Sequence, residues 1–223
     1  MTQLAVIFDV GGVLVESPFV AALRWRAEMG LPDETLAVFF EEYARLPEPG
    51  AEPPMWHRVE MGQVDVQQFL DHVRPRLDGL VDDDHPIHTI TGADFNVFRD
   101  AGAHWRMIHK VRDLAAAGHK TAILTNNVRE WGSWREVIPV DWFDVVIDSS
   151  EVGLRKPDPA IWHLALERLG TPAHRSIFLD DHPSNVEAAV DLGIAGLTVS
   201  ADIDLAIEEL DLLVEAMSGG QSP

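Results

Sequence analysis

From residue 103 onward, short apolar runs alternate with longer amphipathic segments, and this alternation constrains the fold more than any other feature. The short runs are rich in aliphatic and β-branched residues, as buried strands are, and a similar run at residues 4–8 ends at Asp9. The longer segments repeat apolar residues every three or four positions, as helices do. This order predicts an α/β fold with a doubly wound parallel sheet. The expected strands span 4–8, 121–124, 145–147, 177–179 and 196–199, and the expected helices of this part span 105–115, 129–138, 160–169, 184–192 and 203–217.

The stretch between the first strand and residue 102 has a different character. It holds helix-like patterns at about 20–29, 36–46 and 66–77, separated by Pro-rich, Gly-rich and acidic breaks, and no strand as clear as the first. We therefore expect residues 1–16 and 102–217 to form a catalytic core and residues 17–101 to form an inserted all-helical cap subdomain. Residues 218–223 are expected to be a disordered tail.

Composition excludes several classes of function. The 223 residues include 37 acidic and 17 basic side chains, a formal charge of −20, and no cysteine. Disulfides, iron–sulfur clusters, thiolate zinc sites and a cysteine nucleophile are thereby excluded. The acidic excess argues against nucleic acid and against an anionic membrane surface, and no apolar run reaches the roughly 20 residues of a membrane span. We expect a cytoplasmic monomer or homodimer.

Polar residues follow the expected strands at the positions where ligands bind in open α/β sheets, beyond the carboxyl ends. Asp9 follows the first strand, Thr125 the second, Lys156 the loop after the third, and Asp180 and Asp181 the fourth. Three neighbouring carboxylates repel one another and are stabilised by a cation, and oxygen ligands of this hardness favour Mg²⁺. A metal and a lysine beside a nucleophilic carboxylate suit phosphoryl transfer.

Four segments resemble, in order, the four motifs of the haloacid dehalogenase (HAD) superfamily, whose core is a Rossmann-like sheet. The helical insert resembles the cap of its subfamily I, in which WHRVEMGQ (Trp56–Gln63) is similar to a recurring cap segment. The four motifs are FDVGGVL (Phe8–Leu14), ILTNN (Ile123–Asn127), GLRKPDP (Gly153–Pro159) and FLDDHPSNVEAA (Phe178–Ala189).

The resemblance implies a Mg²⁺-dependent hydrolase, a phosphatase that forms an aspartyl-phosphate on Asp9 and acts on a small phosphorylated metabolite such as a sugar phosphate or nucleotide. Thr125 would hydrogen-bond the phosphoryl group, and Lys156 would bridge it to the nucleophile. Further implied roles are metal binding by Asp9, the Gly11 carbonyl, Asp180 and Asp181, phosphate or substrate binding by Gly12, Asn126, His57 and Arg58, and orientation of the last loop by Asn185.

Gly11 departs from the family pattern. Phosphatases of the superfamily commonly carry a second Asp at this position, which protonates the leaving oxygen and activates water, and glycine does neither. We expect slow turnover or a substitute group, with His182 and His57 as candidates. Two alternatives stay open: a haloacid-dehalogenase-type hydrolase, and a catalytically weak binding or regulatory protein. Candidate contacts to the rest of the substrate are Trp56 and the arginines Arg24, Arg26, Arg45 and Arg58.

Overall fold

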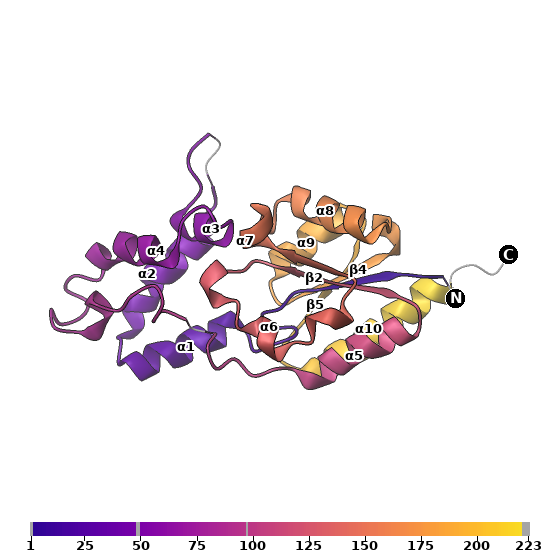
Figure 1. Cartoon of the computed structure of the whole chain (residues 1–223), viewed down its shortest axis with the longest axis horizontal. Coiled ribbons are helices and arrows are strands. Elements are labelled where there is room, and N and C mark those ends of the chain that lie inside the picture. Colours follow the sequence, from indigo (N-terminus) through magenta and orange to yellow (C-terminus); the bar gives the residue numbers. More distant parts are fainter. Residues whose placement is uncertain (1, 48–49, 97, 220–223) are drawn as a thin grey trace.

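Five parallel strands form the predicted sheet in a computed structural model that describes residues 2–47, 50–96 and 98–219 (Figure 1). The strand order is β3-β2-β1-β4-β5, so β1 lies in the centre. Phe8 at the end of β1 pairs with Ile123 on one side and Leu179 on the other, which aligns the carboxyl ends of three strands. The strands are β1 (Ala5–Phe8), β2 (Lys120–Thr125), β3 (Val145–Asp148), β4 (Ser176–Asp180) and β5 (Ala195–Thr198).

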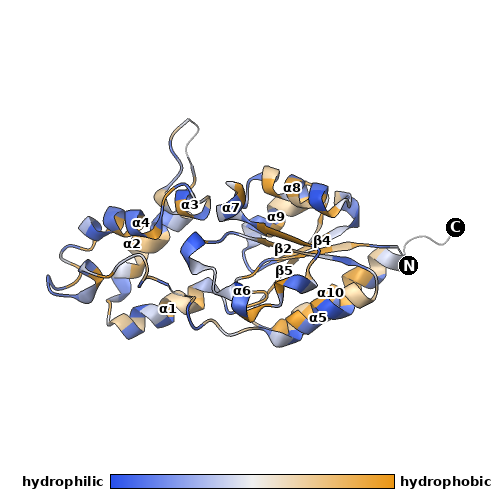
Figure 2. Ribbon diagram, viewed as in Figure 1, coloured by the Kyte–Doolittle hydropathy of each residue, from blue (hydrophilic) through white to orange (hydrophobic). Residues whose placement is uncertain are grey.

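Helices cover both faces of the sheet because alternate strand residues point to opposite sides. Val6 and Phe8 belong to one buried cluster and Ala5 and Ile7 to the other. Apolar colour follows the strands and the helix faces turned toward them (Figure 2). No helix within the described ranges combines the length and apolar composition that crossing a membrane requires. The first face packs α5 (Trp105–Ala116), α6 (Trp134–Val137) and α10 (Ile203–Gly219), and the second packs α8 (Pro159–Leu169) and α9 (Pro183–Asp191).

The insert packs as helices beyond the carboxyl ends of the strands, where Figure 1 places its coils opposite the chain termini. Its buried residues, Phe69 and Leu70 among them, form an apolar cluster that also takes in Val128 and Trp131 from the segment after β2. Its two ends are joined by backbone hydrogen bonds of 2.8 Å, from Glu16 to Gly102 and from His104 to Leu14. We therefore propose 17–101 as the cap and 1–16 with 102–217 as the core. The helices of the insert are α1 (Pro18–Met29), α2 (Asp33–Ala44), α3 (Met55–Glu60) and α4 (Val66–Val73).

Several elements differ from the sequence prediction. The expected helix over 129–138 is two short pieces separated at Gly132, a residue that disfavours helix interiors. Neither α3 nor α7 (Ser149–Val152) was predicted. Each has at most six residues, which is too short for a helical repeat of apolar residues to show in the sequence. Helix α10 runs two residues past its expected end at 217, and residues 220–223 of the expected tail lie outside the described residues. Short 3-10 helices span Arg74–Arg76, Pro86–His88, Arg129–Trp131, Val140–Trp142 and Ala173–Arg175.

The contact between β5 and α9 gives a test of the core. A Cβ at Gly196 would lie 2.5 Å from Cγ1 of Val186 and 2.8 Å from Cγ2 of Val190. Gly196→Val is expected to lower the free energy of unfolding by about 1–3 kcal/mol, because the added side chain overpacks this contact. Gly102→Ala is the control, since nothing lies within 4 Å of its Cβ position. Urea denaturation measures both, and equal stability of the two variants would contradict the close packing of α9 on β5.

Candidate functional site

The polar residues predicted to share one edge of the sheet lie together there. Asp9, Thr125, Lys156, Asp180 and Asp181 all line one cavity between the sheet and the insert. One oxygen from each of the three carboxylates lies within 4.8 Å of the others. The cause is the register of the sheet, since Asp9 directly follows β1, Thr125 ends β2 and Asp180 ends β4.

Lys156 is the charged centre of this group, with a side chain only 1% exposed. Its Nζ lies 2.6 Å from Oδ2 of Asp180 and 2.9 Å from Oδ1 of Asp9. The second contact is an ion pair within hydrogen-bonding distance. Burial alone would lower the pKa of Lys156, but the charges of Asp180 and Asp9 outweigh burial and raise it. The lysine is therefore a buried ammonium ion.

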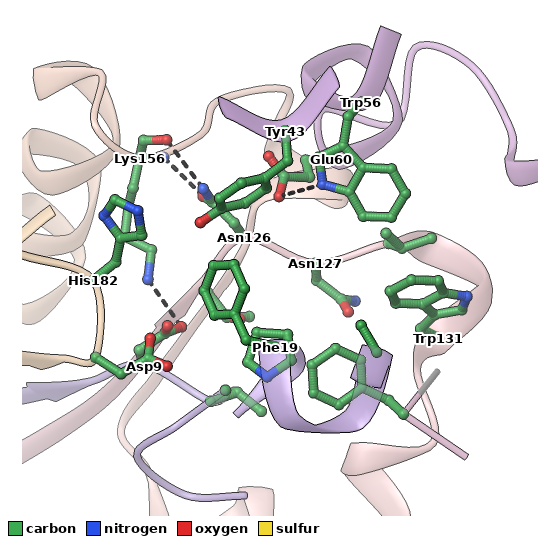
Figure 3. A pocket seen from close by; sticks show the side chains of 18 of the residues that line it. Asp9, Phe19, Tyr43, Trp56, Glu60, Asn126, Asn127, Trp131, Lys156 and His182 are labelled. Carbon is green, nitrogen blue, oxygen red and sulfur yellow. Dashed lines mark hydrogen bonds and ion pairs between the residues drawn. The ribbon is translucent and has the colours of Figure 1, made fainter. Parts of the chain in front are cut away.

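Asn126 holds the backbone of Lys156 in place. Its Oδ1 accepts a hydrogen bond of 2.8 Å from the amide of Lys156, and its Nδ2 donates one of 3.0 Å to the carbonyl of the same residue. Both polar atoms of the Asn126 side chain are thus engaged across 30 positions of sequence. The structure gives Asn126, which was predicted to bind substrate, a positioning contact with the lysine (Figure 3).

Asp180 is completely buried and surrounded by donors. Besides Lys156, it accepts a hydrogen bond of 2.7 Å from the amide of His182 and two of 3.1 Å from Nδ2 of Asn185. The predicted role of Asn185 in orienting this loop agrees with these contacts. Because its oxygens are engaged by protein donors, Asp180 is less available to a cation than Asp181, which accepts a hydrogen bond of 2.9 Å from the Ser17 hydroxyl.

The other two carboxyl groups have perturbed pKa values. Burial raises the pKa of Asp9 to about 7, Lys156 opposes this, and the charges of Asp180 and Asp181 add to it. Burial and the charge of Asp180 also raise the pKa of Asp181. The three carboxyl groups share one lysine ammonium, Lys156, so their negative charges exceed the positive charge of that lysine. The donor set, carboxylate oxygens with local negative charge, fits a hard divalent cation such as Mg²⁺.

The two glycines after Asp9 are both sterically required. A Cβ at Gly12 would lie 2.2 Å from Oδ2 of Asp181, and its φ of +71° lies in the left-handed region that favours glycine. At Gly11 a Cβ would meet Cδ of Pro18 at 2.9 Å. The first residue of α1 therefore occupies the space where a side chain at position 11 would begin.

Two predicted substrate-binding residues do not reach the cavity. His57 is buried, its Nε2 lies 3.0 Å from the carbonyl oxygen of Tyr43, and the contact joins α3 to α2. Burial lowers the pKa of His57, so its neutral form is favoured. Arg58 points to Glu52, at 3.1 Å. Neither residue belongs to the cavity lining, because their positions on the short helix α3 direct them elsewhere, whereas the predicted Trp56 does line it.

Sequence reasoning missed much of the cavity wall. Phe19 on α1 and Phe40 and Tyr43 on α2 line it, together with Trp131 after β2. The i, i+3 spacing of Phe40 and Tyr43 places them on one helix face and was a usable signal. Ser17, which donates to Asp181, precedes α1 and carries no motif of its own. In Figure 3, Asp9, Lys156 and His182 lie on one side of the cavity and Trp56 and Trp131 on the other.

These features define a hydrolase of the HAD type: a parallel sheet whose carboxyl edge carries a carboxylate after the first strand, a buried lysine and an acidic pair. The model of the haloacid dehalogenase-like hydrolase family matches residues 4–193. The chain belongs to this family, as its four motifs predicted.

Curated relatives agree with this assignment. Acyl-CoA dehydrogenase family member 10 of Mus musculus is 32% identical over 94% of this chain and 19% of its own length. Bifunctional epoxide hydrolase 2 of Sus scrofa is 28% identical over 95% of this chain and 39% of its own length. The chain thus spans less than half the length of either. The sesquiterpene phosphatase astK of Aspergillus oryzae is 31% identical over 46% of this chain and 54% of its own.

Solved structures share the fold. A HAD family enzyme of Bacteroides thetaiotaomicron, in complex with magnesium and inorganic phosphate, superposes with a TM-score of 0.63 at 18% identity, covering 90% of this chain and 96% of its own. The L-2-haloacid dehalogenase of Xanthobacter autotrophicus has a TM-score of 0.60 at 22% identity, covering 100% of this chain and 85% of its own. Since similar folds carry phosphate in one case and a haloacid in the other, the fold alone does not choose between them.

The buried ion pairs of Lys156 give a test of the site. Lys156→Met is expected to lower the free energy of unfolding by about 3–5 kcal/mol, because buried carboxyl groups lose their compensating charge. Lys110→Met is the matched control, since Lys110 pairs with Asp211, a half-exposed carboxylate on α10, and such pairs contribute about 0–1 kcal/mol. Chemical denaturation in EDTA compares the two, and similar losses would contradict the central position of Lys156.

Proposed function

We propose that this chain is a Mg²⁺-dependent phosphatase that hydrolyses small organic phosphomonoesters through an aspartyl-phosphate on Asp9. One observation carries the proposal: three carboxyl groups meet within 4.8 Å, and one buried ammonium pairs with two of them, Asp9 and Asp180. This charge pattern fits a divalent cation and the phosphate oxygens that such a cation attracts. The phosphatase named among the relatives supports the same chemistry.

Each residue of the edge has a proposed part in metal or phosphate binding. Asp9, Asp181 and the carbonyl of Gly11 would hold Mg²⁺, with Asp180 beside them, and bound Mg²⁺ would neutralise charge on the phosphate oxygens. Thr125 would donate its hydroxyl hydrogen to the phosphoryl group. Gly12 lets the backbone approach Asp181 closely, since a larger residue would collide with that carboxylate.

The reaction proposed has two displacements. The Asp9 carboxylate attacks phosphorus, a new P–O bond forms, and the bond from phosphorus to the substrate's ester oxygen breaks. That oxygen leaves with the electron pair and takes up a proton to become an alcohol. A water molecule then attacks phosphorus and gives a proton to the group that protonated the alcohol, while the bond to Asp9 breaks, its electron pair returns to the carboxylate, and inorganic phosphate leaves. The Lys156 ammonium, next to Asp9, offsets the negative charge in both displacements.

Gly11 cannot donate the proton that the leaving oxygen needs. Pro18 occupies the space that a side chain at position 11 would require. Of the two candidate histidines, His182 lines the cavity and His57 does not. The His182 ring packs against that of Tyr43, with centroids 6.0 Å apart, and its Nδ1 lies 2.8 Å from the Ser184 hydroxyl. We therefore propose His182 as the group that supplies this proton.

Phosphate release is the test of the nucleophile. Wild-type protein with Mg²⁺ is expected to release phosphate from p-nitrophenyl phosphate, and EDTA is expected to abolish the release. Asp9→Asn should lower kcat by on the order of 10³-fold or more, because the amide is a poor nucleophile. Asp113→Asn, at an exposed position on α5, is the control. Activity that survives EDTA or Asp9→Asn would overturn the phosphatase proposal, and chloride release from a 2-haloacid would favour the dehalogenase alternative.

The two histidines can be separated by kinetics. His182→Ala is expected to lower kcat by about 10²-fold, within the usual range for loss of a proton donor. His57→Ala is expected to keep kcat and lower the melting temperature, because it loses the contact with the Tyr43 carbonyl. Steady-state assays and thermal melts check both outcomes. If His182→Ala and His57→Ala both retain full kcat, neither histidine replaces the acid that Gly11 lacks.

A further inference from the structure

The cavity continues away from the catalytic carboxylates into a wall of aromatic side chains. Phe19 on α1 lies 5.5 Å from Phe40 and 5.6 Å from Tyr43, both on α2, measured between ring centroids. Farther along, Trp56 of α3 lies 5.5 Å from Trp131. Figure 3 shows Phe19, Tyr43, Trp56 and Trp131 around one space, with Asp9 at its edge. A substrate whose phosphate reached Asp9 would place its organic part among these rings.

These rings have contact area left for a ligand. Phe19, Phe40, Tyr43 and Trp56 are only half-buried, although each packs against another ring. Exposed aromatic surface in a concave space is stabilised by an apolar ligand that removes it from water. Aromatic side chains also stack with unsaturated or ring-containing ligands. The aromatic wall therefore favours an apolar organic group over one that carries many hydroxyl groups.

The protein already engages the indole nitrogens of Trp56 and Trp131 and the carboxylate of Glu60. Glu60 accepts a hydrogen bond of 3.0 Å from Nε1 of Trp56 and forms an ion pair of 2.7 Å with Arg155. Nε1 of Trp131 donates to the carbonyl of Phe95, at 2.6 Å. A sugar hydroxyl placed beside Trp56 or Trp131 would lose its hydrogen bonds to water and would have to displace one of these contacts to recover them, which disfavours a polar group in this part of the cavity.

The arginines proposed from sequence to contact an anionic substrate lie elsewhere. Arg24 pairs with Glu16, Arg26 with Asp33, and Arg45 lies 3.9 Å from Glu42. None of these, nor Arg58, lines the cavity. Lys156, which does line it, is already held between two carboxyl groups. Within the described part of the chain, the wall therefore offers no cation for a second anionic group of the substrate.

We propose that the substrate is the monophosphate ester of an uncharged, apolar alcohol, and not a sugar phosphate or a nucleotide. This inference rests on the proposed function, because it assumes that the phosphate binds at Asp9. Phe40 is a specificity-determining residue: it contacts the organic part and is distant in the sequence from every catalytic motif. The charged edge of the sheet binds the phosphate, and the aromatic wall binds the alcohol part of the ester.

A series of primary phosphate esters tests this substrate class, because their leaving groups are chemically similar and only the organic part changes. With Mg²⁺, kcat/KM for n-octyl phosphate and 2-phenylethyl phosphate is expected to exceed that for glycerol 3-phosphate, glucose 6-phosphate and AMP by at least about 100-fold, mainly through KM. Equal or higher kcat/KM for the polar esters, with activity still lost in Asp9→Asn, would overturn the substrate class and leave the phosphatase proposal standing.

Variants of the wall make the test specific. Phe40→Asn is expected to lower kcat/KM for n-octyl phosphate by about 10-fold or more and to leave that for glycerol 3-phosphate within about twofold, because only the apolar ester uses the wall. Phe19→Asn is the second variant, in case the first fails to fold. Leu46→Asn, at a side chain 81% exposed just beyond α2, is the matched control and should change neither value. An equal loss for both esters would contradict the proposed role of Phe40.

Binding without turnover separates this inference from the proposed function. Calorimetry with n-octanol and 2-phenylethanol, the alcohols that would be released, requires no phosphoryl transfer. Wild-type protein is expected to bind them at least about 10-fold more tightly than Phe40→Asn does, and to show no heat with glycerol. If no ester is hydrolysed but the alcohols bind, the phosphatase proposal fails and the apolar site stands. Absence of binding to the apolar alcohols would overturn the inference.

Discussion

The buried ammonium of Lys156 is the interaction on which the rest of the catalytic edge depends. It lies between Asp9 and Asp180, two carboxyl groups brought together by adjacent strands. Without this charge, the sheet would place acidic groups side by side in a region from which water is largely excluded. Asn126 holds the lysine's backbone, so the end of β2 contributes to the same arrangement. The site is therefore a consequence of strand order as much as of residue identity.

Much of the fold was predictable because the physical signals were local. All-apolar runs marked the strands to within about a residue, and the side chains at the carboxyl ends of β1, β2 and β4 share an edge as parallel topology requires. The motifs then predicted Asp9, Lys156 and Asp181 as neighbours, and the structure places them so. For these elements sequence position and spatial position are directly related, because a short strand leaves little freedom in the placement of the residues next to its end.

The insert was harder to predict because its side-chain directions depend on packing between helices. His57 and Arg58 sit in a segment that resembles a family motif, yet α3 turns one toward α2 and the other toward Glu52. The aromatic wall is assembled from helices α1, α2 and α3 and the segment after β2, and no one segment reveals it. Likewise, the closure of position 11 by Pro18 depends on where α1 begins in space. Such contacts follow from tertiary structure, which local patterns do not encode.

Two consecutive residues of one loop bind opposite sides of the cavity. Arg155 pairs with Glu60 of the insert, and Lys156 pairs with Asp9 and Asp180 of the core. A single peptide bond thus separates the cation that pairs with the insert from the cation that pairs with Asp9. This loop therefore fixes the spacing between Asp9 and the aromatic wall, and for the substrate that we propose this spacing would limit the length of the alcohol that fits.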